Sequence, residues 1–72
     1  MTTLTPHRLT QAELRDLPAV VDVPTAAAAL GIGRSAAYEL IREGRWPTPI
    51  VRLGKLIRIP TASLLDVLRV SR

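Results

Sequence analysis

Residues 30–44 read LGIGRSAAYELIREG, a glycine-rich turn followed by a helix with two distinct sides. On a helical wheel at about 100° per residue, the side chains after Gly33 divide into two halves, and no residue crosses the divide. The polar half holds Arg34, Ser35, Tyr38, Glu39, Arg42 and Glu43, and the other half holds Ala36, Ala37, Leu40 and Ile41. One half is therefore expected to pack on a core, and the other is left free to meet a partner.

A second helix is predicted directly before this turn. It begins at Pro24 or Thr25, with Thr25 as its cap, and it continues through four alanines at residues 26–29, which are strong helix formers. Gly31 suits the left-handed position after a helix end, and Gly33 is an acceptable cap for the helix that follows. Two helices joined by a three-residue turn with glycine are typical of a helix-turn-helix.

The chain before residue 20 is predicted to be an N-terminal arm (residues 1–19), partly disordered or folded as a short helix. Residues 10–13, TQAE, have the pattern of a capping box, and Pro18 would end the helix that it starts. The domain that holds the helix-turn-helix is assigned to residues 20–70.

Residues 50–53 and 56–59 are apolar-rich and predict a β-hairpin around Gly54 and Lys55. A two-residue loop would mix apolar and basic side chains on both faces. A three-residue loop at residues 54–56 sets Arg52 opposite Arg58, and it places Val51, Leu53, Ile57 and Ile59 on one apolar face. We therefore predict the three-residue loop, which leaves the two arginines facing each other on the outer side.

The segments flanking the hairpin complete the predicted core. Pro47 and Pro49 exclude helix from the connector before it, and Trp46 is expected to cover one edge of the core. A last helix over residues 60–69 carries Leu64, Leu65 and Leu68 on one face. The predicted fold class is mainly α with a small β-hairpin: a winged helix-turn-helix of about three helices and a two-stranded wing.

Composition narrows the classes of function. The chain has 72 residues, no cysteine and one histidine, so neither a disulfide framework nor a metal site is expected. No apolar run reaches the ~18–20 residues that span a bilayer. No nucleophile–base pair or carboxylate pair is visible, so we expect no catalytic residues and no cofactor. The expectation is a non-enzymatic cytoplasmic protein without membrane contact, associated with the nucleoid when bound to DNA.

The positive charge is concentrated where the two motifs lie. Residues 31–60 hold six basic and two acidic side chains, a net charge of +4 that equals the net charge of the whole chain. A localised basic patch attracts the phosphates of double-stranded DNA.

The second helix of a helix-turn-helix enters the major groove, and its first residues meet the base edges. The expected contacts on that helix are made by Arg34, Ser35, Tyr38 and Arg42. The hairpin acts as a wing, with Arg52, Lys55 and Arg58 on the phosphate backbone or in a neighbouring minor groove. Thr25 and Arg45 are further phosphate-contact candidates.

The order of these motifs resembles a known family. Residues 30–44, then VRLGKLIRIP at residues 51–60 and Leu64-Leu65, are similar to the small winged-helix excisionases, also called recombination directionality factors. Their fold is like that of the DNA-binding domains of mercury-resistance-type (MerR-like) regulators. The resemblance implies binding to repeated sites at the attachment region of a phage or integrative element, DNA bending, and contact with a tyrosine-type integrase that is turned towards excision. It also implies self-association on those repeated sites.

Two other functions stay open from the sequence. The same fold serves small transcription regulators, which act without an integrase. The polar helix face would also suit a protein-interaction adaptor that binds an acidic partner and never touches DNA.

Overall fold

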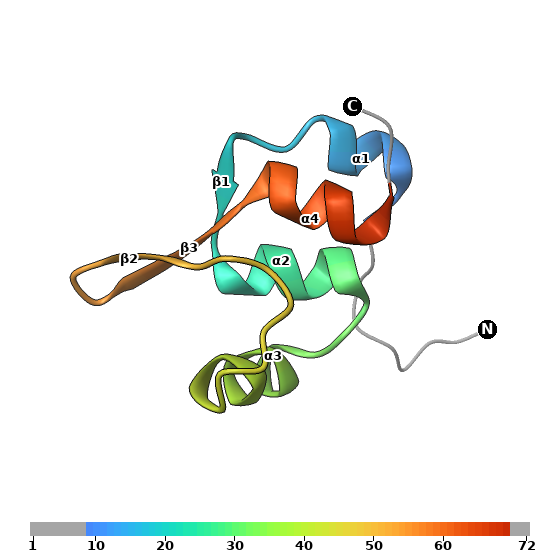
Figure 1. The fold of residues 1–72 in the computed structure, drawn as a ribbon. Coiled ribbons are helices and arrows are strands. Elements are labelled where there is room, and N and C mark those ends of the chain that lie inside the picture. The colour runs from blue at the N-terminus through green and yellow to red at the C-terminus, as the bar shows by residue number, and fades with distance from the viewer. Residues whose placement is uncertain (1–8, 70–72) are drawn as a thin grey trace.

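A computed structural model describes residues 9–69, which contain four helices and a three-stranded antiparallel sheet. The elements are α1 (Gln11–Arg15), β1 (Val20–Val21), α2 (Val23–Leu30), α3 (Arg34–Arg42), β2 (Val51–Leu53), β3 (Leu56–Pro60) and α4 (Thr61–Leu68). Helix α2 lies between α3 and α4, and the β2–β3 hairpin projects from the body on the side away from α1 (Figure 1). This arrangement confirms the predicted winged helix-turn-helix class, with β1 as an additional strand that pairs with β3.

The predicted N-terminal capping box is present. The Thr10 hydroxyl accepts from the Glu13 N–H at 3.1 Å, and the Glu13 carboxylate accepts from the Thr10 N–H at 2.8 Å. The short helix α1 follows, and its Leu14 is buried. Residues 1–8 of the predicted arm lie outside the described part of the chain.

Helix α2 begins earlier than predicted, and Thr25 is not its cap. Asp22 is the N-cap residue: its carboxylate accepts from the Thr25 N–H at 2.9 Å, and Pro24 lies in the first turn, where a missing N–H costs nothing. The pKa of Asp22 is lowered from 3.8, mainly because the Thr25 side chain and N–H bond to its carboxyl. The positive charge of Arg58 lowers this pKa further.

Replacing this cap gives a pH-dependent loss of stability. Asp22→Ala is expected to lower the free energy of unfolding by about 1 kcal/mol near neutral pH, because a helix donor loses its acceptor. The pKa of Asp22 is lower in the folded protein than in the unfolded chain. The ionised carboxylate therefore stabilises the fold at pH values above the unfolded-state pKa, and this stabilisation is lost as the pH falls through the folded-state pKa. Urea unfolding at about pH 7 and about pH 3 should therefore show that the difference in free energy of unfolding between the wild type and Asp22→Ala is smaller in acid.

Asp22→Asn is the matched control for that measurement. Asparagine keeps the acceptor but cannot ionise, so it should retain most of the stability and respond to acid less than the wild type does. If the free energies of unfolding of the wild type and Asp22→Ala differ by the same amount at both pH values, the assignment of Asp22 as the cap is wrong.

The turn between α2 and α3 forms as the glycines predict. Gly31 adopts a φ of 74°, a left-handed conformation that most residues avoid, and it ends α2 as predicted. Gly33 caps α3 through its extended backbone, without a side-chain bond. The inward face of α3 differs at one position from the helical-wheel division, because Ala37 and Ile41 are buried whereas Ala36 is exposed.

The wing has a different register from the one predicted. Strands β2 and β3 pair Val51 with Arg58, Arg52 with Ile57 and Leu53 with Leu56, so the loop holds only Gly54 and Lys55. Gly54 has a φ of 63° at the first loop position and Lys55 does not have a positive φ, the pattern of a type II′ hairpin turn.

The sequence argument failed because it assumed that one whole face of the hairpin covers the core. Only the base of the hairpin does so, through half-buried Ile57 and fully buried Ile59, and its tip extends beyond the core. Arg52 and Arg58 therefore lie on opposite faces, and the predicted repulsion between them is absent.

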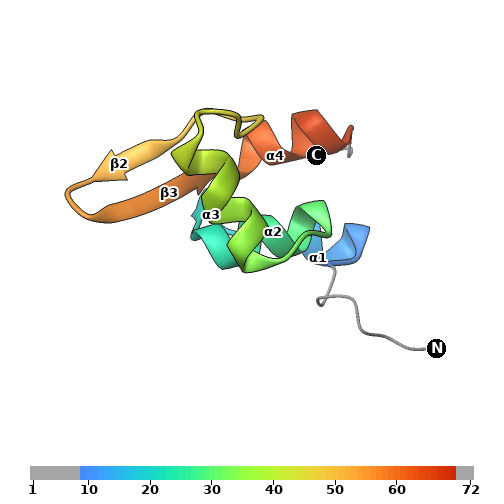
Figure 2. The ribbon, with the colours of Figure 1, turned by 90° about the horizontal axis from the view of Figure 1, so that it is seen from below.

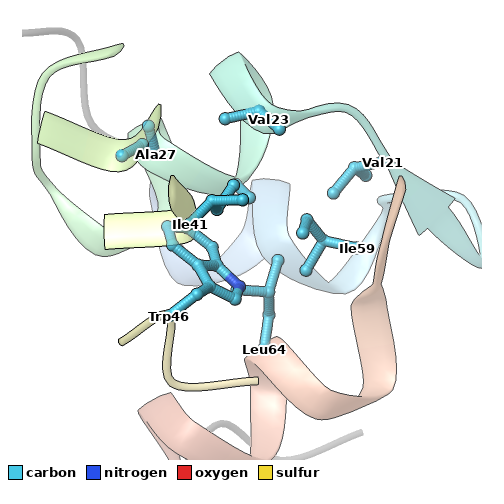
Figure 3. Packing of buried hydrophobic residues seen from close by; sticks show 9 residues of the cluster. Val21, Val23, Ala27, Ile41, Trp46, Ile59 and Leu64 are labelled. Atoms are coloured by element: carbon cyan, nitrogen blue, oxygen red, sulfur yellow. The ribbon is translucent and has the colours of Figure 1, made fainter. Parts of the chain in front are cut away.

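The core joins all the larger elements of the domain. Val21, Val23, Ile41, Ile59 and Leu64 pack in one cluster with the single tryptophan, and the alanines of α2 and α3 complete it (Figure 3). As predicted, Trp46 is buried at the edge of the core, and its Nε1 donates to the hydroxyl oxygen of buried Thr48 at 2.8 Å. This bond satisfies the polar end of the indole and holds the connector that leads from α3 into the wing.

Candidate nucleic-acid interface

Helix α3 presents its predicted polar face to solvent. Arg34, Ser35 and Arg42 are exposed, and Tyr38 retains 44% of its accessible surface. Ala37 and Ile41 anchor the opposite side of the helix in the core. Four side chains that hydrogen-bond or carry positive charge therefore line one rigid helix face, as expected from the sequence.

Two of the basic residues at the end of α3 are paired with acidic neighbours. Glu39 accepts from the guanidinium of Arg42, one turn further along, and Arg45 Nη1 lies 3.5 Å from Glu43 Oε1. The two arginine side chains are largely exposed and the two glutamates are about half exposed, and such surface ion pairs contribute little, up to about 1 kcal/mol. Pairs this weak leave both guanidinium groups able to exchange partners.

The wing lies beside this helix face. Tyr38, Ile41 and Arg42 of α3 line a shallow groove whose other wall is formed by Arg52 and Ile57 of the wing. Figure 2 views the molecule with α3 in front and the hairpin extending to one side of it. Tyr38 and Arg42, two of the predicted helix contacts, thus border one groove with the wing cation Arg52.

A second hollow lies on the other side of Tyr38. It is lined by Asp22 and Val23 at the start of α2, by Tyr38, and by residues 55–58 of the wing. Half-buried Arg58 belongs to this side, where its Nη1 donates to the Ile57 carbonyl at 2.9 Å and its charge lowers the pKa of Asp22. Arg58 therefore faces the body of the molecule, whereas Lys55 is exposed in the turn at the wing tip.

Comparison with known families agrees with this geometry. The model of a family described as a helix-turn-helix domain matches residues 20–70, most of the chain. The chain belongs to this helix-turn-helix family. No curated protein and no solved structure matches it.

The protein is thus a DNA-binding helix-turn-helix protein, in which α2 and α3 are the two helices of the motif and residues 31–33 form the turn. None of its helices within residues 9–69 is long and apolar enough to cross a membrane.

Two residues of the helix-turn-helix differ in role from what the sequence indicated. Thr25 is not the cap of α2, because it is half-buried and gives its own N–H to the Asp22 carboxylate. Its assignment as a phosphate-contact candidate stays a prediction. Asp22 was missed as a structural residue at the edge of the site. The signal was present, because an aspartate two residues before a proline that opens an alanine run is a typical helix start.

Proposed function

We propose that this helix-turn-helix protein is an excisionase, which binds repeated sites at an attachment region and turns a tyrosine-type integrase towards excision. The single observation that supports DNA recognition is the shared surface of α3 and the wing, on which an exposed arginine-tyrosine face adjoins a basic hairpin. The order of motifs along the chain supports the excisionase role, and the protein acts through binding and bending DNA without catalysis.

Helix α3 supplies the sequence readout. Arg34 is the first residue of this helix and is exposed, and from this position a guanidinium reaches the two acceptors of a guanine edge. Ser35 bonds a base or a phosphate beside it, and the Tyr38 hydroxyl bonds a phosphate one turn further on. Arg42 reaches the DNA backbone after exchanging Glu39 for phosphate.

The wing holds the duplex from the side. Arg52 lies in the groove shared with Tyr38 and Arg42, where a phosphate would meet two guanidinium groups. Lys55 reaches outward from the tip, and Arg58 adds positive charge nearer the body. Arg45 provides a phosphate contact at the end of α3, and Thr25 does so at the start of α2. These contacts position the protein, and the contacts of α3 specify the site.

Two linked assays test the function. Footprinting on the DNA that surrounds its own gene is expected to show protection of repeated sites. Recombination of an integrated element by the neighbouring tyrosine integrase is then expected to shift from integration to excision when the protein is added. The control is an Arg34→Ala variant, which should fail in both assays.

The outcomes separate the alternatives. Protection without any effect on excision, combined with a changed reporter signal in cells lacking the integrase, would identify a transcription regulator on the same fold. No protection at low salt would contradict the DNA surface itself and favour an adaptor that binds an acidic protein.

A further inference from the structure

The tip of the wing carries an apolar pair that the core does not use. The observed register places Leu53 directly opposite Leu56, on either side of the two-residue turn. Leu53 is 57% exposed and Leu56 is 53% exposed, more than any other large hydrophobic side chain in residues 9–69. Val51 lies on the same face and is also exposed. Two adjacent leucines in water at the end of a projecting hairpin are unfavourable unless a partner covers them.

Leu56 of this apolar pair borders the candidate DNA surface. Leu56 and Lys55 line the hollow that Tyr38 borders on one side, while Arg52 lines the groove on the other side of the same tyrosine. Residues from both faces of the wing thus adjoin α3, so a duplex held against α3 lies within reach of the tip. The cations Arg52 and Lys55 lie next to the leucines in sequence, and each is exposed.

We infer that Leu53 and Leu56 form an apolar wedge that enters the minor groove and partly unstacks one base step, which kinks the duplex. The inference rests on the proposed DNA-binding function and names the residues that would do the bending. Aliphatic side chains are known wedges between base steps, and flexible pyrimidine–purine steps are the easiest to open.

The side chains at the wing tip suit insertion into a minor groove. Unstacking exposes apolar base faces, and contact with two leucine side chains removes both apolar surfaces from water. Lys55, between the leucines along the hairpin, and Arg52 on the opposite face can each neutralise a phosphate at the edge of the groove. A partner protein would cover the leucines equally well, but Leu56 and Lys55 line one hollow together with Tyr38 of the candidate DNA surface, and this favours DNA.

The test uses the full chain and a short duplex that contains one protected site. Dyes at the two duplex ends report bending by energy transfer, and 2-aminopurine placed at successive steps reports unstacking by its fluorescence. The variant is Leu53→Ser/Leu56→Ser. The control is Val67→Ser, which changes an exposed aliphatic side chain on α4, and Leu53→Met/Leu56→Met keeps an apolar tip.

The wild type, Val67→Ser and the methionine variant are expected to bend the duplex and to raise the 2-aminopurine signal at one step. Leu53→Ser/Leu56→Ser is expected to lose both signals while still binding, and its thermal unfolding should match that of the wild type because both leucines are exposed. An unchanged bend in the serine variant would overturn the wedge and leave DNA binding intact.

Two further results distinguish this inference from the function on which it rests. Unchanged bending of a single site, with loss of cooperative binding to adjacent sites, would assign the leucines to a neighbouring protein copy and overturn the wedge. Loss of both signals in the serine variant, with no effect of the wild type on excision, would support the wedge and contradict the excisionase role.

Discussion

Ile59→Ala is expected to remove much of the free energy of unfolding of this protein. Ile59 is fully buried, lies in the central strand of the sheet and pairs with buried Val21. Removing most of such a side chain leaves a cavity and typically costs about 2–5 kcal/mol. A domain of this size has a free energy of unfolding of only roughly 5 kcal/mol, so one substitution can remove most of it.

Unfolding of this variant can be followed through Trp46, the single tryptophan, which is buried in the same cluster. Urea titration of tryptophan fluorescence and far-ultraviolet circular dichroism should give coincident transitions, shifted to much lower urea for Ile59→Ala. Val67→Ala is the matched control, because its side chain is 45% exposed and its loss should change stability by less than about 0.5 kcal/mol. A midpoint for Ile59→Ala close to that of the wild type would show that the core is assembled differently.

Ile59 also links stability to the DNA surface. Strand β3 starts at the wing tip with Leu56, passes through the core at Ile59 and leads directly into α4. The direction of the wing is therefore set by a buried residue in the same strand. Substitutions that destabilise the packing of Ile59 should therefore weaken DNA binding as well.

Arg34→Ala is expected to give the largest loss of sequence-specific binding. A guanidinium that bonds two acceptors of a guanine discriminates by about 1–3 kcal/mol, which corresponds to roughly a 5- to 150-fold loss of affinity for the preferred site. Binding to unrelated DNA should fall much less, because that binding depends on charge. Fluorescence anisotropy with the protected site and with a scrambled duplex measures both quantities.

Lys55→Ala separates readout from charge in the same assay. It should weaken binding to both duplexes by similar factors and reduce the slope of log affinity against log salt by about 1. Arg15→Ala removes an equal charge from α1, which lies away from the wing and α3, and should change neither the preference nor the slope appreciably. Equal losses on both duplexes for Arg34→Ala would remove α3 from the readout.

Much of this domain follows from short-range patterns in the sequence. The capping box before α1, the left-handed Gly31 after α2 and the outward face of α3 were each predicted, because caps and helical faces depend on residues within one or two turns. The burial of Trp46 was predicted because it is the single tryptophan of a chain without phenylalanine.

The wing register required the folded structure. Alternation of apolar residues predicts which side chains share a face only when one whole face is buried, and that condition depends on how far the body of the protein extends. Here the core ends at Ile57 and Ile59, so the turn chemistry of Gly54 determines the pairing and exposes Leu53 and Leu56.

The identity of each helix and the residues on its outward side were therefore encoded locally in the chain. The groove between α3 and the wing, and the position of Arg58 beside Asp22, arose from packing between segments far apart in sequence. Local hydrogen bonding and side-chain spacing act over a few residues. The placement of a hairpin depends instead on the shape of the core from which the hairpin projects.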